Sequence, residues 1–196
     1  MTVFTATRWQ DNGALIEDVP RLGYLDKRVL DSTYGYGAFW SRWRPIDLVA
    51  CDLDPAKSPI GYSVDFRALP FDDQSVNTVG LAPPYKLNRT PSDVDERYGV
   101  HVPTRWRERH ELIRAGITEC SRGASNYLLL KCMDQVCSGR KRWQTIEFTT
   151  HAPTVGLRLE DRFDKLVTRR PQPEGRRLVH TQGNYSSLLV FRKRNR

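Results

Sequence analysis

Short apolar runs recur along this chain, and polar or helix-forming stretches separate them. Alternation of short apolar runs with helical stretches indicates an α/β fold. The run Tyr127-Leu128-Leu129-Leu130 is continuous, as expected for a strand buried on both faces of a sheet. The predicted strands cover residues 28–30, 48–51, 62–64, 76–81, 126–131, 161–167 and 185–191.

Three stretches predict helices, at residues 13–22, 103–120 and 138–151. The second carries Pro103 in its first turn, a position that proline tolerates well. Pro20 falls inside the first, so we expect that helix to end early. Residues 86–102 are polar and show no periodicity, which predicts a long loop, and long loops in compact domains are often functional.

The size and composition predict a single domain over residues 1–196. A chain of 196 residues with 39% hydrophobic residues can bury a sizeable core. No apolar run approaches the roughly 20 residues that span a bilayer, and residues 1–11 lack the layout of a signal peptide. These features predict a cytoplasmic protein without a membrane partner.

The four cysteines form no CxxC pair and no zinc-ligand spacing, so we expect reduced thiols and no metal site. The sequence also contains no Pro-Cys dipeptide. This argues against methylation at carbon 5 of cytosine, which needs a thiolate nucleophile.

The positive charge is concentrated near the end of the chain. The net charge is +8, and residues 152–196 contain 11 Lys or Arg against four Asp or Glu. A basic segment of this kind is the expected footprint of polyanion binding, although basic residues also keep small domains soluble.

A glycine-rich turn follows the first predicted strand, at Asp31-Ser32-Thr33-Tyr34-Gly35-Tyr36-Gly37. Glycines at positions i and i+2 allow positive φ and close approach of the backbone to a ligand. The turn lies at the carboxyl end of a strand, where open α/β sheets bind their ligands. This pattern predicts cofactor contacts from Asp31, Thr33, Tyr34, Gly35 and Gly37.

Acidic residues follow the next two predicted strands. Asp52 ends the second, where a carboxylate is placed to accept the ribose hydroxyls of a nucleoside. Asp65 ends the third and is expected to accept from an adenine amino group, with Phe66 against the ring. Because residue 40 is tryptophan, the pattern GxGxxG is not met, which favours S-adenosylmethionine over a dinucleotide.

The fourth predicted strand runs into Ala82-Pro83-Pro84-Tyr85. Together with the preceding motifs, this segment resembles the amino-methylating DNA methyltransferases, in which Asp, Asn or Ser precedes Pro-Pro and an aromatic residue. The likeness covers most of the sheet and extends to small methylases of actinobacteria and their phages. It implies a Rossmann-like class I methyltransferase fold: a mostly parallel seven-stranded sheet with an antiparallel C-terminal hairpin and helices on both faces.

The resemblance implies transfer of a methyl group from S-adenosylmethionine to adenine N6 or cytosine N4 in DNA. In this motif the first side chain and the first proline carbonyl accept from the amino group, while the aromatic ring stacks on the flipped base. Ala82 supplies no side-chain acceptor, which by analogy lowers activity roughly 10²–10³-fold. An RNA methyltransferase, or a nucleic-acid-binding protein with a decayed site, therefore remains as an alternative.

Basic and polar residues near the predicted site are candidates for contact with nucleic acid. The loop 86–102 leaves directly from the proline motif, and Lys131 ends the fifth predicted strand at the same rim. Arg140 lies near the start of the predicted helix 138–151, whose N-terminus favours phosphate. The predicted contact residues are Lys86, Asn88, Arg89, Lys131, Arg140, Arg169 and Arg170.

Overall fold

The computed structural model describes residues 9–87, 105–167, 179–181 and 183–194. Its main sheet has six strands in the order β2-β1-β3-β4-β8-β7. The pairs β2–β1, β1–β3 and β3–β4 are parallel, whereas β8 is antiparallel to both of its neighbours. The strands are β1 (Val29–Asp31), β2 (Leu48–Ala50), β3 (Val76–Leu81), β4 (Ala124–Cys132), β7 (Leu157–Leu166) and β8 (Tyr185–Lys193).

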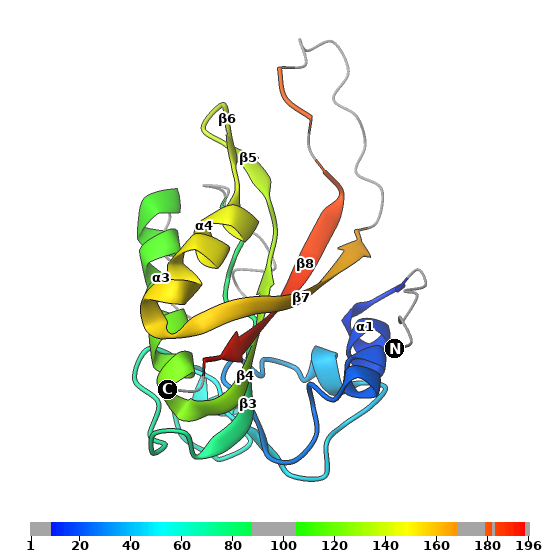
Figure 1. Ribbon diagram of the computed structural model, residues 1–196, viewed down its shortest axis with the longest axis vertical. Coiled ribbons are helices and arrows are strands. Elements are labelled where there is room, and N and C mark those ends of the chain that lie inside the picture. Colours follow the sequence, from blue (N-terminus) through cyan, green and yellow to red (C-terminus); the bar gives the residue numbers. More distant parts are fainter. Residues whose placement is uncertain (1–8, 88–104, 168–178, 182, 195–196) are drawn as a thin grey trace.

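Helices cover both faces of this sheet (Figure 1). α3 (Trp106–Gly123) and α4 (Gln144–His151) lie on one face, and α1 (Asn12–Asp18) lies on the other. Short 3₁₀ helices complete the described elements: η1 (Val19–Leu22), η2 (Ala38–Trp40), η3 (Pro55–Lys57) and η4 (Ala152–Val155). None of the described helices is long and apolar enough to cross a bilayer.

Strand β4 supplies side chains to two separate hydrophobic cores, as its continuous apolar run predicts. Leu128 and Leu130 pack in the core beneath α3 and α4, whereas Leu129 packs in the core beneath α1. All three side chains are at most 2% exposed. The α/β fold class, the mostly parallel sheet and the antiparallel C-terminal hairpin are therefore confirmed.

The prediction of a strand at residues 62–64 is wrong, so the described sheet has six strands instead of seven. Val64 donates one backbone hydrogen bond to Asp52 O, at 2.9 Å, but forms no strand ladder. The chain from Leu69 to Phe71 is fastened by side chains of α3 instead.

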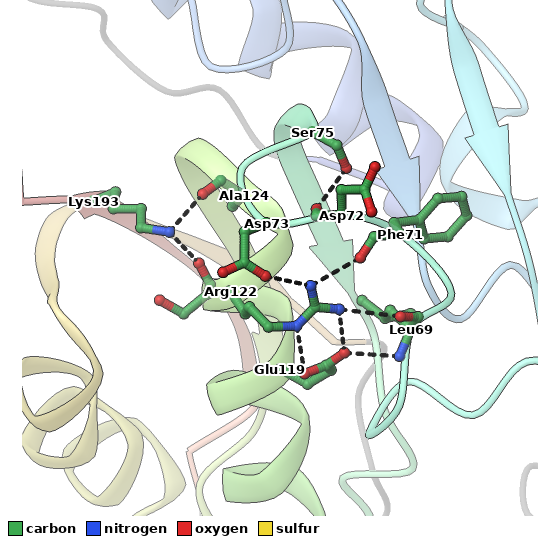
Figure 2. Close-up of polar contacts among 10 residues, drawn as sticks. Leu69, Phe71, Asp72, Asp73, Ser75, Glu119, Arg122, Ala124 and Lys193 are labelled. Carbon is green, nitrogen blue, oxygen red and sulfur yellow. Dashed lines mark hydrogen bonds and ion pairs between the residues drawn. The ribbon is translucent and has the colours of Figure 1, made fainter.

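Arg122 and Glu119 form this fastening (Figure 2). The Arg122 guanidinium donates to the carbonyls of Leu69 and Phe71, at 3.0 and 2.8 Å, and Glu119 accepts from Leu69 N at 2.9 Å. The same guanidinium pairs with Glu119 and Asp73, at 2.6 and 2.7 Å. These side chains satisfy backbone groups that a neighbouring strand would otherwise satisfy.

The predicted helix 138–151 begins later than expected. Residues Gln135–Cys137 form β5 and Arg140–Arg142 form β6, an antiparallel hairpin between β4 and α4. Ser138 and Gly139, both with positive φ, connect the two strands. Arg140 therefore lies on an exposed hairpin and not at the N-terminus of a helix.

Candidate functional site

The glycine-rich turn lies at the carboxyl end of β1, where the sequence predicts it. Gly35 and Gly37 have φ angles of 55° and 68°, which favour glycine. A Cβ atom at Gly37 would lie 2.7 Å from Tyr34 Oη, whereas one at Gly35 would meet nothing within 4 Å. Gly37 thus allows the turn to pack against its own tyrosine, and Gly35 borders open space in which a ligand can approach the backbone.

Asp31, the last residue of β1, stabilises the glycine-rich turn by accepting hydrogen bonds. Its carboxylate is 3% exposed and accepts from Thr33 N at 2.9 Å and from Trp40 Nε1 at 2.7 Å. Burial raises the pKa of Asp31 to about 6, and the hydrogen bonds from Thr33 and Trp40 partly oppose that rise. The position of Asp31 supports an organising role in the turn. The role of Trp40 was not anticipated from the sequence, although an indole N–H buried in a core needs an acceptor.

Asp52 connects the glycine-rich turn after β1 to the turn that follows β2. It follows β2, and its two oxygens accept from Gly35 N at 2.7 Å and from Asp54 N at 2.9 Å. A carboxylate oxygen has two lone pairs, so each oxygen of Asp52 can accept a further hydrogen bond. The structure thereby brings Asp52 and Gly35 together at adjacent strand ends, as the sequence predicts.

Asp65 and Phe66 are placed differently from the prediction. Asp65 follows no strand, and its two oxygens bond the side chain of Arg67, with one oxygen also accepting from Arg67 N. The Arg67 guanidinium holds the pKa of Asp65 below its usual range. Phe66 is 7% exposed and packs against α3, where a Cβ at Gly116 would lie 2.5 Å from the ring. Phe66 is therefore a core residue in this structure.

The proline motif begins where β3 ends, next to the glycine-rich turn. Ala82 N donates to Thr33 Oγ1 at 2.7 Å, and the Thr33 hydroxyl also hydrogen-bonds the Asp31 carboxylate. Pro83 and Pro84 are buried, and Tyr85 is half-buried. A single threonine side chain thus joins the two motifs that the sequence identified separately.

Two glutamines hold the backbone after the prolines. Gln135 Nε2 and Gln144 Nε2 both donate to Tyr85 O, at 2.8 and 2.6 Å. Leu87 N donates to Gln135 Oε1 at 3.3 Å. Gln144 is fully buried, so this arrangement fixes the exit of the chain from the motif. Neither glutamine carried a recognisable signal in the sequence, because the contacts join segments about 50 residues apart.

The predicted nucleic-acid contacts are only partly brought together. Lys86 is half-buried beside the motif and Arg140 is exposed on β6. Lys131 is 1% exposed, which contradicts its predicted place at the rim. Lys131 pairs with Leu188 of β8, and its Nζ donates to Ser186 O, so the side chain lies within the sheet and not at an exposed rim. Asn88, Arg89, Arg169 and Arg170 lie outside the described residues.

The described basic residues at the ends of the C-terminal hairpin lie away from this site. Arg158, Arg192, Lys193 and Arg194 line a cavity of about 530 Å³. Lys193 Nζ donates to Ser121 O and Ala124 O, at 2.6 and 2.9 Å, at the beginning of β4 (Figure 2). These cations therefore lie at the edge of the sheet opposite the glycine-rich turn.

Exposed aromatic side chains occur at the same edge as the two motifs. Tyr36 follows β1, Trp143 precedes α4, and Tyr185 begins the antiparallel strand β8; their exposed fractions are 74%, 52% and 52%. Lys57 Nζ lies 5.3 Å from the ring centroid of Tyr36, and Lys141 Nζ lies 5.0 Å from that of Trp143. Aromatic rings beside cations are suited to stacking on bases. The basic run directly before Trp143 is the sequence signal for this surface.

Comparison with known proteins identifies the fold. No family model and no curated protein matches the sequence. A putative RNA methyltransferase from Pyrococcus horikoshii superposes with a TM-score of 0.60 at 9% identity, over 93% of this chain and 83% of the other. The magnesium protoporphyrin IX methyltransferase from Synechocystis PCC 6803, with bound S-adenosylmethionine, gives 0.54 at 13% identity, over 93% and 77%. The chain has the class I methyltransferase fold.

A SAM-dependent methyltransferase from Aquifex aeolicus has the same fold, with a TM-score of 0.50 at 13% identity over 91% of this chain and 89% of the other. In a class I methyltransferase fold, as in other open α/β sheets, ligands bind outside the carboxyl ends of the strands. Both sequence motifs of this chain lie at that edge.

Proposed function

We propose that this chain is an S-adenosylmethionine-dependent methyltransferase that modifies an exocyclic amino group of a base in DNA, adenine N6 or cytosine N4. The hydrogen bond from Ala82 N to Thr33 Oγ1 is the observation that carries the proposal. It joins the glycine-rich turn, suited to a nucleoside cofactor, to the proline motif, suited to an amino substrate. A methyl donor bound at the glycine-rich turn and a base bound at the proline motif would therefore be neighbours.

The residues at the first turn fit S-adenosylmethionine. Gly35 borders open space, and Asp52 retains lone pairs that suit ribose hydroxyls. Asp65 would bind the adenine amino group only after exchanging contacts with Arg67. When bound, S-adenosylmethionine supplies a methyl group on a positively charged sulfur, which departs as a neutral thioether.

The proline motif fits the amino substrate. The ring of a base would stack on Tyr85, and the Pro83 carbonyl would accept from its amino group. Gln135 and Gln144 contribute by holding the Tyr85 backbone, because a positioned acceptor needs a fixed main chain.

The surface around the motifs supports a nucleic acid rather than a small molecule. Tyr36, Trp143 and Tyr185 are exposed at this edge, and Lys57 and Lys141 lie over two of the rings. RNA presents the same chemistry, so the experiment below compares both polymers. All four cysteines are free thiols, which supports the proposal that the chain acts in the reducing cytoplasm.

Transfer of radiolabelled methyl groups to unmethylated DNA and to RNA tests this function, followed by mass analysis of the nucleosides. We expect N6-methyladenine or N4-methylcytosine in the DNA. Tyr85→Ala should lower turnover, and Tyr85→Phe is the matched control because it keeps the stacking ring. Calorimetry should show S-adenosylmethionine binding in the micromolar range, about −8 kcal/mol.

Three results separate the alternatives. Transfer to RNA alone would identify an RNA methyltransferase. Cofactor and DNA binding without transfer to either polymer would indicate a decayed site. Turnover that survives Tyr85→Ala unchanged would contradict the proposed place of the substrate.

A further inference from the structure

Lys131 is a buried lysine at the end of β4, near the proline motif. Its side chain projects to the α1 face of β4, is 1% exposed and is one of the largest of the fully buried side chains. Its Nζ donates to Ser186 O at 3.4 Å, beyond the usual range of about 2.7–3.2 Å. A long bond to a single carbonyl holds an amine only weakly.

Lys131 lies beside the altered position of the proline motif. The parallel register pairs Gly80 with Leu129 and Leu81 with Leu130, so the next residues along the two chains are Ala82 and Lys131. Leu81 and Leu130 share the core beneath α3, and Ala82 packs against the core beneath α1. Ala82, directly after β3, and Lys131, on β4, therefore face the same side of the sheet, in which neighbouring strands lie about 4.8 Å apart. A lysine side chain is long enough to cross that spacing.

The surroundings favour the neutral amine. Burial and, to a smaller extent, the positive charge of Lys165 on β7 lower the pKa of Lys131 to about 7. Asp164 on β7 and Cys132 on β4 act in the opposite direction. Ala82 on the β3 side and Leu188 and Ser186 on the β8 side are uncharged. Asp11, at the start of α1, raises the pKa of Lys165.

We propose that the neutral amine of Lys131 is the side-chain acceptor that replaces the missing Asp, Asn or Ser at position 82. The inference rests on the proposed amino-methyltransferase function. Lys131 Nζ would turn from Ser186 O toward Ala82 and accept a hydrogen bond from the amino group of the base. This move gives up the 3.4 Å contact to Ser186 O.

The chemistry balances with this residue as the base. The amino nitrogen uses its lone pair to form a bond to the methyl carbon, while the carbon–sulfur bond breaks and its electron pair stays on sulfur. The positive charge then lies on the amino nitrogen, which transfers one proton to Lys131 Nζ. The resulting ammonium loses that proton to solvent. No oxidant, reductant or metal is needed.

Two variants test the role by activity. Lys131→Met fills the buried site with an uncharged chain of similar length and should lower turnover roughly 10²–10³-fold, with cofactor affinity unchanged. Wild-type turnover should rise with pH through about 7, as the amine loses its proton, and Lys131→Met should lose this dependence. Adding Ala82→Asp to Lys131→Met should restore much of the turnover, because the carboxylate then supplies the acceptor.

Two lysine controls sharpen the pH measurement. Lys165→Met removes a like charge, so the midpoint of the wild-type profile should move to higher pH. Lys193→Met changes a lysine at the opposite edge of the sheet, so it should lower stability but leave the midpoint where it was.

A direct titration gives a readout that does not depend on turnover. Carbon NMR of selectively labelled lysine in the full chain should show Lys131 titrating near pH 7, and titration above pH 9 would overturn the proposal. Equal turnover and pH profiles for wild type and Lys131→Met would also overturn it, while leaving the proposed function intact. A wild-type chain that transfers no methyl group would instead contradict the proposed function, and this role with it.

Discussion

Replacement of Thr33 by valine tests whether the two motifs depend on one side chain. Valine keeps the shape of threonine but removes the acceptor of the 2.7 Å bond from Ala82 N and the hydroxyl that bonds Asp31. Loss of such a bond in a half-buried place costs about 1–3 kcal/mol of unfolding free energy. In a chain of this size each kcal/mol lowers Tm by about 2–4 °C.

Chemical denaturation measures this loss, and Thr33→Ser is the matched control because it retains the hydroxyl. We expect the serine variant to stay close to wild type in turnover and the valine variant to fall, since the turn and the proline motif would lose their shared contact. The pKa of Asp31 should also rise further in Thr33→Val, because the threonine hydroxyl bond lowers it. Equal unfolding midpoints and equal turnover for the two variants would refute this reasoning.

Three further perturbations address the surrounding structure. Asp52→Asn should weaken S-adenosylmethionine binding at least about tenfold, or about 1.4 kcal/mol by calorimetry, because the charged acceptor is lost; unchanged affinity would remove Asp52 from the cofactor site. Burial raises the pKa of Asp31 from 3.8 to about 6, so the free energy of unfolding should fall by about 3 kcal/mol as the pH rises from below 4 to above 6. Asp31→Asn should flatten this part of the stability–pH curve. The lysine in Arg122→Lys cannot contact both carbonyls, so this variant should lower the free energy of unfolding by about 2 kcal/mol. Arg21→Lys, at an exposed arginine, is the control, and a smaller effect for Arg122→Lys than for Arg21→Lys would contradict the role of the guanidinium.

The parts of the fold that were predictable from the sequence are those with a local pattern. The continuous apolar run of β4 identifies a central strand, and glycine and proline identify the turns after β1 and β3. Arg140 and its neighbours were expected to begin a helix, because hairpin turns with positive φ at a serine have no strong local signal.

Residues that depend on distant partners were predicted less well. Residues 62–64 were expected to form a strand, but Val64 makes one backbone hydrogen bond to Asp52 O, and the following chain at Leu69 is held by side chains of α3, about 50 residues away. Lys131 was expected at the rim, because a charged side chain at a strand end is usually exposed. Its burial follows from the pairing of β4 with both β3 and β8, which the local sequence does not contain.

The fastening of residues 69–71 by Arg122 and Glu119 has a consequence for how this region can change during evolution. A strand ladder depends on the number of residues in the strand, because an insertion of one residue turns every following side chain to the other face. A guanidinium that holds two carbonyls fixes only those two points. Homologous chains should therefore accept insertions and deletions at the exposed residues 61–63 with little loss of stability, while Arg122 and the length of the segment 69–71 stay constant.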